Sequence, residues 1–296
     1  MKKGAIYTAI IGKGYDLVHQ PKHVDENYDY ILFSDELPIG RDGVWEIRRL
    51  NYCHVIPIKT ARYVKTHPHE LLPEYEITIW IDANVIIQKS EFYHRVEELY
   101  QSNVDFSTMW HSCDGIYEAM LIILCNHWEN EDVIIRWGQY LRKHNYPRHN
   151  GLHETNVIYR LNNGITKQFN ETWWNFINMY SRRDQFSFDY VLWKSILRYE
   201  NFLPDETNTR NSDIFYVPDH KNDKIKDVAS TYGNVFVQYL ALRRDRLNEI
   251  VDTYVRIFDT SCPFILRIWY GLYYRLRNIS IIIRRVIRNK LKNKYL

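Results

Sequence analysis

The sequence predicts an α/β fold in which a mostly parallel sheet is flanked by helices and followed by a C-terminal helical, basic tail. Short runs of β-branched and apolar residues recur along the chain, and segments with helical spacing lie between them. Strands that alternate with helices favour parallel pairing, because each helix carries the chain back to the same edge of the sheet. A chain of 296 residues is long enough for one large domain of this kind with an appendage.

The expected strands are apolar runs that end in glycine or polar residues. Residues 4–11, GAIYTAII, form the first strand, and Gly12 and Gly14 mark the turn after it. Further strands are expected at 28–34, at 44–50, at 77–87, at 105–111, within 151–162 and at 213–220. The strand at 28–34, YDYILFS, ends at Asp35, so an acidic residue should close it.

Helices are expected between these strands. The first, ARYVKTHPHELL at 61–72, places Arg62 and Lys65 three residues apart on one face. Other helical patterns cover 91–102, about 117–144 and the second half of 182–197. These segments would supply the crossovers of the sheet.

The C-terminal part of the chain differs in charge. A polar stretch near 222–227 predicts a main domain at 1–225, a helical extension at 226–262 and a basic amphipathic tail at 263–296. The tail has no acidic residue, and Arg and Lys alternate there with Ile, Leu, Trp and Tyr. Such a segment can lie on an anionic membrane surface, attract nucleic acid or pack on the main domain. We expect no nucleic acid, because no recognised nucleic-acid module accompanies the tail.

Cysteine usage and hydropathy favour cytoplasmic residence. The four cysteines are widely separated without a C-x-x-C pair, so we expect reduced core thiols rather than a zinc site or a disulfide framework. The apolar run near the N-terminus is too short for a signal peptide, and no stretch reaches the roughly 20 apolar residues of a spanning helix. The tail would allow peripheral attachment to the inner face of the plasma membrane.

An aspartate interrupts the strand expected at 77–87, within IWIDANVII. A carboxylate inside a buried strand needs compensation, whereas at the carboxyl end of a strand it faces the crevice where open α/β sheets bind ligands. Asp82 and Asn84 would project to the same side of the strand, because side chains alternate. Two such oxygen ligands suit Mg²⁺ or Mn²⁺ held against a diphosphate. The alternative is that Asp82 caps the following turn.

Four blocks of sequence resemble a known family. They are IYTAIIGKGYD at 6–16, ARYVKTHPHELLPEYEITIWIDANV at 61–85, GLHETNVIYRLN at 151–162 and RRDQFSFDYV at 182–191. The chain resembles the glycosyltransferase-like family first catalogued as the domain of unknown function 616, which looks like a GT-A type nucleotide-sugar transferase. The second and fourth blocks are the specific ones, whereas the first occurs in many nucleotide-binding sheets.

The resemblance implies a nucleotide site along the first strands. Thr8, Ala9 and Ile10 lie where a GT-A first strand meets the nucleoside, and Asp35 lies where an acidic residue commonly contacts base or ribose. The resemblance also implies that two basic residues, Arg62 and Lys65, reach toward the diphosphate.

For the metal, the resemblance places Asp82 and Asn84 at the D-x-D position, with asparagine in place of the second carboxylate. This implies Mn²⁺ or Mg²⁺ as cofactor. Some similar enzymes take a third metal ligand from the segment after a late strand, and this chain has His220 at that place. By contrast, His67 and His69 flank Pro68 and do not match H-E-x-x-H, so we expect them to be structural.

An inverting transferase needs a base that takes the proton of the acceptor hydroxyl. Asp184, in RRDQ, is the first candidate, and Glu154, in GLHET, is the second. Asp184 could instead cap the helix that follows it. In a retaining enzyme neither residue need be a base.

The expected function is transfer of a sugar from a nucleotide-sugar donor to a hydroxyl of a polysaccharide or lipid-linked oligosaccharide, in surface glycan biosynthesis. The enzyme would be a metal-dependent hexosyltransferase, with inversion favoured over retention. One alternative is a nucleotide-sugar or glycan binding protein without catalysis, to which Asn84 and the altered block WHSCDGIYEAM at 110–120 give some support. Another is a lipid or glycan hydrolase, since Asp and Glu pairs also activate water, but no G-x-S-x-G or zinc-protease motif supports it.

Overall fold

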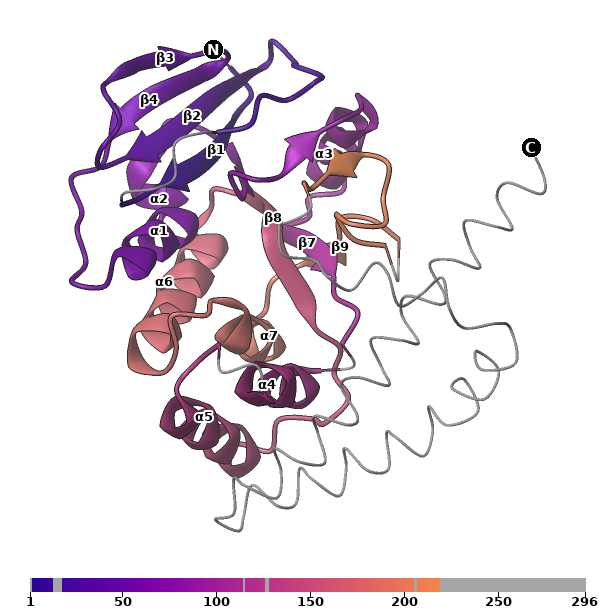
Figure 1. The fold of residues 1–296 in the computed structure, drawn as a ribbon. Coiled ribbons are helices and arrows are strands. Elements are labelled where there is room, and N and C mark those ends of the chain that lie inside the picture. The colour runs from indigo at the N-terminus through magenta and orange to yellow at the C-terminus, as the bar shows by residue number, and fades with distance from the viewer. Residues whose placement is uncertain (1, 13–17, 114, 126–127, 205–206, 219–296) are drawn as a thin grey trace, which may run out of the picture. The chain divides into compact units, whose positions relative to one another are not determined.

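The computed structural model describes residues 2–12, 18–113, 115–125, 128–204 and 207–218 (Figure 1). The chain divides into two compact units, one of Met1–Asp114 with Asn150–Pro218 and one of Gly115–His149 with Asp219–Leu296. The boundary expected near residue 225, the extension at 226–262, the tail at 263–296 and His220 all lie outside the described residues.

The larger unit is built on an eight-stranded sheet with the order β3-β4-β2-β1-β5-β8-β7-β9. Its strands are β1 (Gly4–Ile10), β2 (Tyr28–Ser34), β3 (Gly40–Asp42), β4 (Trp45–Arg49), β5 (Ile77–Ile81), β7 (Phe106–Trp110), β8 (His153–Leu161) and β9 (Tyr199–Asn201). Pairing is parallel from β4 through β2 and β1 to β5, and between β7 and β9. The predicted α/β fold with a mostly parallel sheet is confirmed, but β3 is antiparallel to β4, and β8 is antiparallel to both of its neighbours.

The strand expected at 77–87 is divided by a turn. β5 ends at Ile81, and the amide of Val85 donates to the Asp82 carbonyl at 2.8 Å, which closes a turn over Asp82–Val85. Asp and Asn favour turns because their side chains compete for backbone hydrogen bonds. The chain then forms β6 (Ile86–Ile87), which pairs with β10 (Phe215–Tyr216) in a separate small antiparallel sheet.

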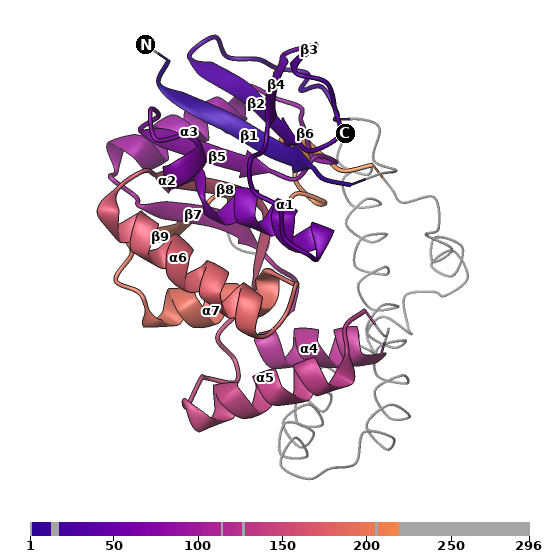
Figure 2. The ribbon, with the colours of Figure 1, turned by 90° about the vertical axis from the view of Figure 1, so that its left-hand side faces the viewer.

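Helices cover both faces of the large sheet (Figures 1 and 2). On one face lie α1 (Pro57–Thr66), α2 (Pro68–Leu71), α6 (Gly164–Met179) and α7 (Gln185–Lys194), and on the other lies α3 (Glu91–Gln101). The helix expected at 61–72 is interrupted at His67, because Pro68 has no backbone N–H to donate and begins α2. The helix α6 was not predicted, although Asn163 caps it by accepting from the Thr166 amide at 2.9 Å.

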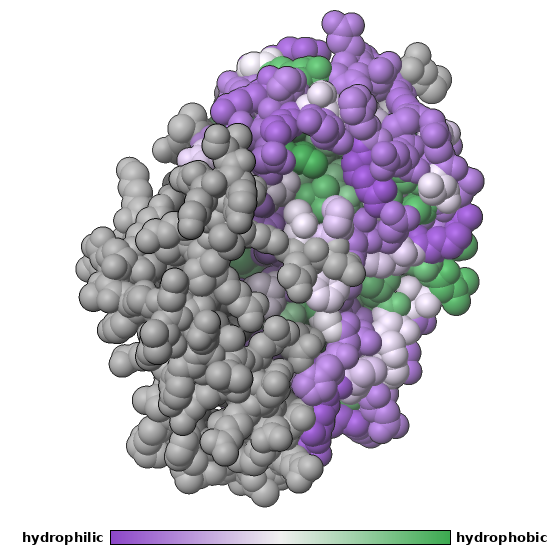
Figure 3. All heavy atoms as spheres, turned by 90° about the vertical axis from the view of Figure 1, so that its right-hand side faces the viewer, coloured by the Kyte–Doolittle hydropathy of each residue, from purple (hydrophilic) through white to green (hydrophobic). Residues whose placement is uncertain are grey.

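The main apolar core lies under α3. Phe92, Val96 and Leu99 of α3 pack with inward residues of the strands, among them Ile79 and Tyr159. Outside the core, the side of the molecule on the right of Figure 1 is mostly hydrophilic over the described residues, with small separate hydrophobic groups (Figure 3). No helix that the structure describes combines the length and the apolar character needed to cross a bilayer. Of the cysteines expected in the core, Cys113 is buried but Cys53 is exposed.

In the smaller unit the described helices are α4 (Ile116–Cys125) and α5 (Glu131–Lys143), which agree with the helical pattern at 117–144. Asn130 caps the N-terminus of α5, and its side chain accepts from the Asp132 amide at 2.8 Å.

An irregularity in β8 determines which side chains reach the site. Thr108 of β7 pairs with Ile158, but the next residue, Met109, pairs with Glu154, so residues 155–157 have no partner on β7. An odd number of extra residues reverses the alternation of side chains along a strand. Thr155 therefore points toward α7, while Tyr159 points into the core under α3.

Candidate active site

Strands β1, β2 and β5 run parallel and side by side, so their carboxyl ends share one edge of the sheet (Figure 2). That edge carries Thr8, Ala9 and Ile10 at the end of β1, Asp35 directly after β2 and Asp82 directly after β5. The structure thus brings these residues to the edge where open α/β sheets bind ligands.

The end of β1 is mostly enclosed. Thr8 and Ile10 are buried and Ala9 is half-buried, so a nucleoside here would meet backbone atoms and Ala9 rather than the other two side chains. Asp35 accepts from the Gly12 amide at 3.0 Å. Gly12 has φ 82°, a left-handed conformation that glycine adopts without strain. One oxygen of Asp35 therefore holds the start of the loop after β1.

Asp82 is a partly exposed carboxylate at this edge. Its side chain is 35% exposed, and its Oδ1 accepts from Trp80 Nε1 at 2.7 Å and lies 3.2 Å from Lys65 Nζ. Its Oδ2 accepts no hydrogen bond from the residues that the structure describes. Asp82 is thus oriented through one oxygen and has the other available for a ligand.

Lys65 and Asp184 form a buried ion pair beneath Asp82. Lys65 Nζ lies 2.6 Å from Asp184 Oδ2 and 2.8 Å from the Thr155 carbonyl, and its side chain is 1% exposed. Thr155 Oγ1 donates to Asp184 Oδ2 at 2.9 Å, and Arg62 Nε lies 3.2 Å from Asp184 Oδ1. Lys65 therefore contacts Asp82 from below and does not itself project toward solvent.

Arg62 is placed differently from Lys65. Its side chain is 21% exposed, and its polar contacts with the residues that the structure describes are made through Nε alone. The terminal nitrogens of its guanidinium group can therefore meet an anion.

The environment of Asp184 favours its charged form. Burial by itself would raise the pKa of this carboxyl, but the charges of Arg62 and Lys65 and hydrogen bonds from Lys65 and Thr155 hold the pKa well below its usual range. A carboxylate with so low a pKa is a weak proton acceptor near neutral pH. Asp184 does precede α7 at the N-cap position, but its side chain makes no capping hydrogen bond.

Glu154 has the opposite electrostatic setting. Its Oε2 accepts from Asn156 Nδ2 at 2.9 Å and from Thr209 Oγ1 at 3.1 Å. Burial, with a smaller contribution from the negative charge of Asp82, raises the pKa of Glu154, and its hydrogen bonds and the nearby Arg210 only partly oppose this shift. Of the two candidate bases, Glu154 is therefore the better proton acceptor near neutral pH.

The oxygen atoms of this edge fit a hard divalent cation. Asn156 Oδ1 is buried and accepts no hydrogen bond in the described part of the structure, and Asp82 offers Oδ2. Asn84 lies half-buried in the turn that begins at Asp82. The sequence suggested that strand alternation places Asp82 and Asn84 on one side. Both residues lie beyond the end of β5, so strand alternation does not determine where their side chains point. Carboxylate and amide oxygens are the ligands that Mg²⁺ and Mn²⁺ prefer.

Sequence reasoning missed several residues near this edge. Trp80 donates a hydrogen bond to Asp82, and Thr155 donates one to Asp184. His153 Nδ1 pairs with the buried carboxylate of Asp189, which also accepts from the His153 amide at 3.1 Å. His153 and Asp189 stand 36 residues apart, so no local motif signals them. A bulge that turns Thr155 toward α7 likewise leaves no pattern that can be read from one sequence.

Comparison with known proteins gives one family and a number of solved structures, including the following two. The model of a family described as TOD1/MUCI70, glycosyltransferase-like domain, matches residues 3–209. A solved structure described as a WbbM bifunctional glycosyltransferase in its apo form is 12% identical with a TM-score of 0.40, covering 69% of this chain and 38% of that chain. A glycosyltransferase involved in the glycosylation of the major capsid of PBCV-1 is 10% identical with a TM-score of 0.34, covering 67% of this chain and 80% of that chain. No curated protein matches the chain.

Proposed function

The chain belongs to the TOD1/MUCI70 glycosyltransferase-like family, and on this premise we propose that it is a metal-dependent, inverting hexosyltransferase of the GT-A type. The donor is a nucleotide sugar, and the acceptor is a hydroxyl of a polysaccharide or lipid-linked oligosaccharide in surface glycan biosynthesis. The observation that carries the proposal is the half-exposed Asp82 carboxylate at the end of β5, oriented by Trp80 and Lys65 beside a second carboxyl, Glu154.

Departure of a nucleoside diphosphate requires positive charge on its oxygens. Asp82 and Asn84 would hold Mn²⁺ or Mg²⁺, which supplies that charge when bound, and His220, outside the described residues, is a further candidate ligand. Arg62 adds a cation through its terminal nitrogens, which make no polar contact with the described residues. Asp184 keeps Arg62 and Lys65 in place, and the β1 end with Asp35 receives the nucleoside.

Glu154 is the base that we assign to the acceptor hydroxyl, in preference to Asp184. We expect the rate of transfer to fall as the pH drops through the raised pKa of Glu154, so the acid limb of the kcat profile lies above pH 4.5, the ordinary value for a glutamic acid. Glu154→Gln should lower kcat by about 10²–10⁴-fold and remove that limb. The profile is measured with saturating donor and acceptor between pH 4 and 9.

The control for this prediction is Glu26→Gln, an exposed residue next to the start of β2 at the opposite edge of the sheet. It should leave both kcat and the pH profile unchanged. If Glu154→Gln kept the wild-type kcat and the acid limb of its pH profile, the base would be another residue. Asp184 and His153 would then be the next residues to change.

The donor is tested by melting the protein with a panel of nucleotide sugars, each with and without Mn²⁺. We expect one donor to raise the melting temperature, and Mn²⁺ to increase that rise, since a ligand that binds only the folded state stabilises it. Sugar transfer to glycan acceptors is then followed by mass spectrometry. Binding without product would favour the non-catalytic alternative, and the absence of any shift across the panel would contradict the proposal.

The proposed site of action is the cytoplasm, with the basic segment at 263–296 holding the enzyme on the anionic inner face of the plasma membrane. This segment lies outside the described residues. Its support is the run of Arg and Lys among apolar residues without any acidic residue. Such attachment would keep the enzyme beside a lipid-linked acceptor.

A further inference from the structure

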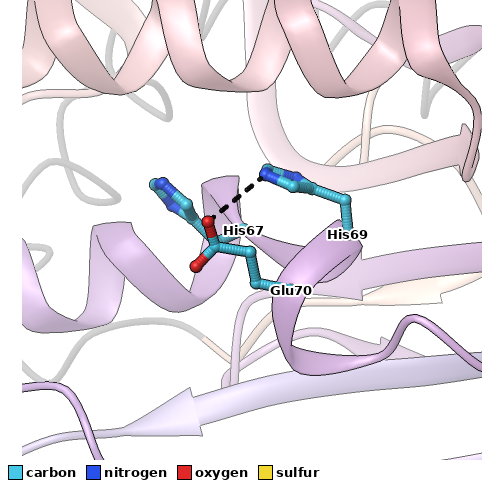
Figure 4. A group of neighbouring side chains, drawn as sticks. All are labelled: His67, His69 and Glu70. Carbon is cyan, nitrogen blue, oxygen red and sulfur yellow. Dashed lines mark ion pairs between the residues drawn. The ribbon is translucent and has the colours of Figure 1, made fainter.

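The elbow between α1 and α2 gathers three residues with metal-binding side chains. His67 lies between the end of α1 and the start of α2, and His69 and Glu70 lie within α2. Each residue offers one ligand atom, and these atoms all lie within 4.8 Å of one another (Figure 4). The carboxylate of Glu70 and the His69 ring point toward one another (Figure 4).

The His69 ring is buried without a hydrogen bond. Its side chain is 5% exposed, and neither ring nitrogen has a hydrogen-bond partner in the described part of the chain. The nearest anionic atoms are Glu70 Oε1 at 3.9 Å and Glu171 Oε1 of α6 at 3.8 Å, both from Nε2. These separations exceed a hydrogen bond. A buried polar group with no partner calls for an explanation, and an ion between these groups supplies one.

His67 and Glu70 are held as metal ligands commonly are. His67 Nδ1 lies 3.1 Å from the Tyr63 carbonyl and 2.9 Å from Thr66 Oγ1. Because a carbonyl only accepts, and Thr66 Oγ1 donates to the Arg62 carbonyl at 2.8 Å, the proton belongs on Nδ1 and the lone pair on Nε2. Tyr63 donates to Glu70 Oε2 at 2.5 Å, which leaves Oε1 for a cation. Supporting hydrogen bonds of this kind orient metal ligands in many proteins.

The charge states suit a cation at neutral pH. Burial lowers the pKa of His67 to about 4 and also lowers the pKa of His69, so both rings are neutral at pH 7. The hydrogen bond from Tyr63 lowers the pKa of Glu70, which is therefore ionised. Two neutral imidazoles and carboxylates can bind a metal without first losing protons.

We propose that His67, His69, Glu70 and Glu171 form a binding site for a divalent transition metal of the Zn²⁺ class. Nitrogen and oxygen ligands in this ratio fit Zn²⁺ better than Mg²⁺, which takes oxygen ligands. The site is separate from the oxygen-lined edge at Asp82 and does not depend on the proposed transferase activity. Since Glu171 belongs to α6, the metal ties the α1–α2 elbow to α6.

The ligands must draw together on binding. At Zn–ligand bonds of about 2.0–2.1 Å, tetrahedral ligand atoms lie roughly 3.3 Å apart, so the separations of 3.8 and 3.9 Å at His69 need only a modest closure. Glu70 and Glu171 can move, because their side chains are 50% and 47% exposed. Lys167 Nζ, 3.8 Å from Glu171 Oε1 and 56% exposed, can turn away into solvent.

The test uses the full chain, stripped with a chelator and dialysed, then titrated with ZnCl₂ while zinc content is measured by mass spectrometry. We expect the wild-type protein to retain one more zinc equivalent than His69→Asn, and its melting temperature to rise with zinc where that of His69→Asn does not. His94→Asn, an exposed histidine on α3 across the sheet, is the matched control and should behave as wild type.

Two further measurements keep the result decisive. If His69→Asn fails to fold, Glu171→Gln, which changes a half-exposed side chain, should weaken zinc binding at least tenfold. Asp82→Asn should keep the zinc equivalent, which separates this site from the proposed transferase site. Equal zinc retention by wild type, His69→Asn and Glu171→Gln, or no retained zinc in the wild-type protein, would overturn the proposal, as would equally tight binding of MgCl₂.

Discussion

Asp184→Ala should destabilise the protein by about 3–5 kcal/mol, the cost of leaving a buried cation without its partner. Asp184 is 5% exposed and accepts from Lys65 and Thr155 while pairing with Arg62. Removing the carboxylate leaves Lys65, which is 1% exposed, with Asp82, the Thr155 carbonyl and the Trp80 ring among its described neighbours. Urea unfolding followed by tryptophan fluorescence measures the change. Loss of transfer in this variant would then reflect the fold as well as the site.

A double-mutant comparison identifies the cause. Lys65→Met and Asp184→Leu should each be about as harmful as Asp184→Ala, whereas Lys65→Met combined with Asp184→Leu should be more stable than either single change, because neither Lys65 nor Asp184 is then left as a buried charge without the other. Glu98→Gln, which breaks an exposed pair with Arg95, should cost no more than about 1 kcal/mol. Strictly additive losses in the double variant would show that Lys65 and Asp184 do not depend on each other.

The acid dependence of this pair has a definite sign. Because the folded-state pKa of Asp184 is lowered, its charged form stabilises the fold above the ordinary pKa of an aspartic acid, about 3.9. That contribution to stability is lost as the pH falls below about 4 toward the lowered pKa of Asp184 in the folded protein. Asp184→Asn should therefore flatten the acid part of the stability curve.

The sequence predicts the strands of this fold better than their directions. The run YDYILFS matches β2 residue for residue, since a mostly buried strand is apolar along most of its length. The antiparallel course of β8 leaves no such trace, because direction depends on the path of the chain before the strand rather than on the strand itself. Likewise, Asn163 marks the start of α6 only once the helix is known.

For the candidate site, the sequence predicts residue types but not their neighbours. The spacing of Arg62 and Lys65 places both on one face of α1, yet it does not show that Asp184, 119 residues beyond Lys65, covers that face. Lys65 consequently lies buried under Asp82 instead of reaching outward. The pKa displacements of Asp184 and Glu154 depend on the same long-range contacts.

Asp82→Asn should lower transfer by about 10²–10³-fold or more with little change in stability, the usual size of effect for losing one electrostatic group in a reacting site. The substituted amide keeps an oxygen that can accept from Trp80 Nε1, so the turn after β5 should persist. Lys65 retains its bonds to Asp184 and the Thr155 carbonyl. What is lost is the negative charge that would hold a divalent cation.

Activity, melting temperature and metal-dependent donor binding together identify the role of Asp82. Its side chain is 35% exposed, so a change there should not disturb the core, and the melting temperature should stay within a few degrees of wild type. Asp42→Asn, on the exposed edge strand β3, should keep full transfer. A variant that loses transfer and the Mn²⁺-dependent part of donor binding, yet melts normally, assigns Asp82 to the metal. Unchanged transfer would remove Asp82 from the mechanism, and the proposed nucleotide site would then lose the residue on which it depends.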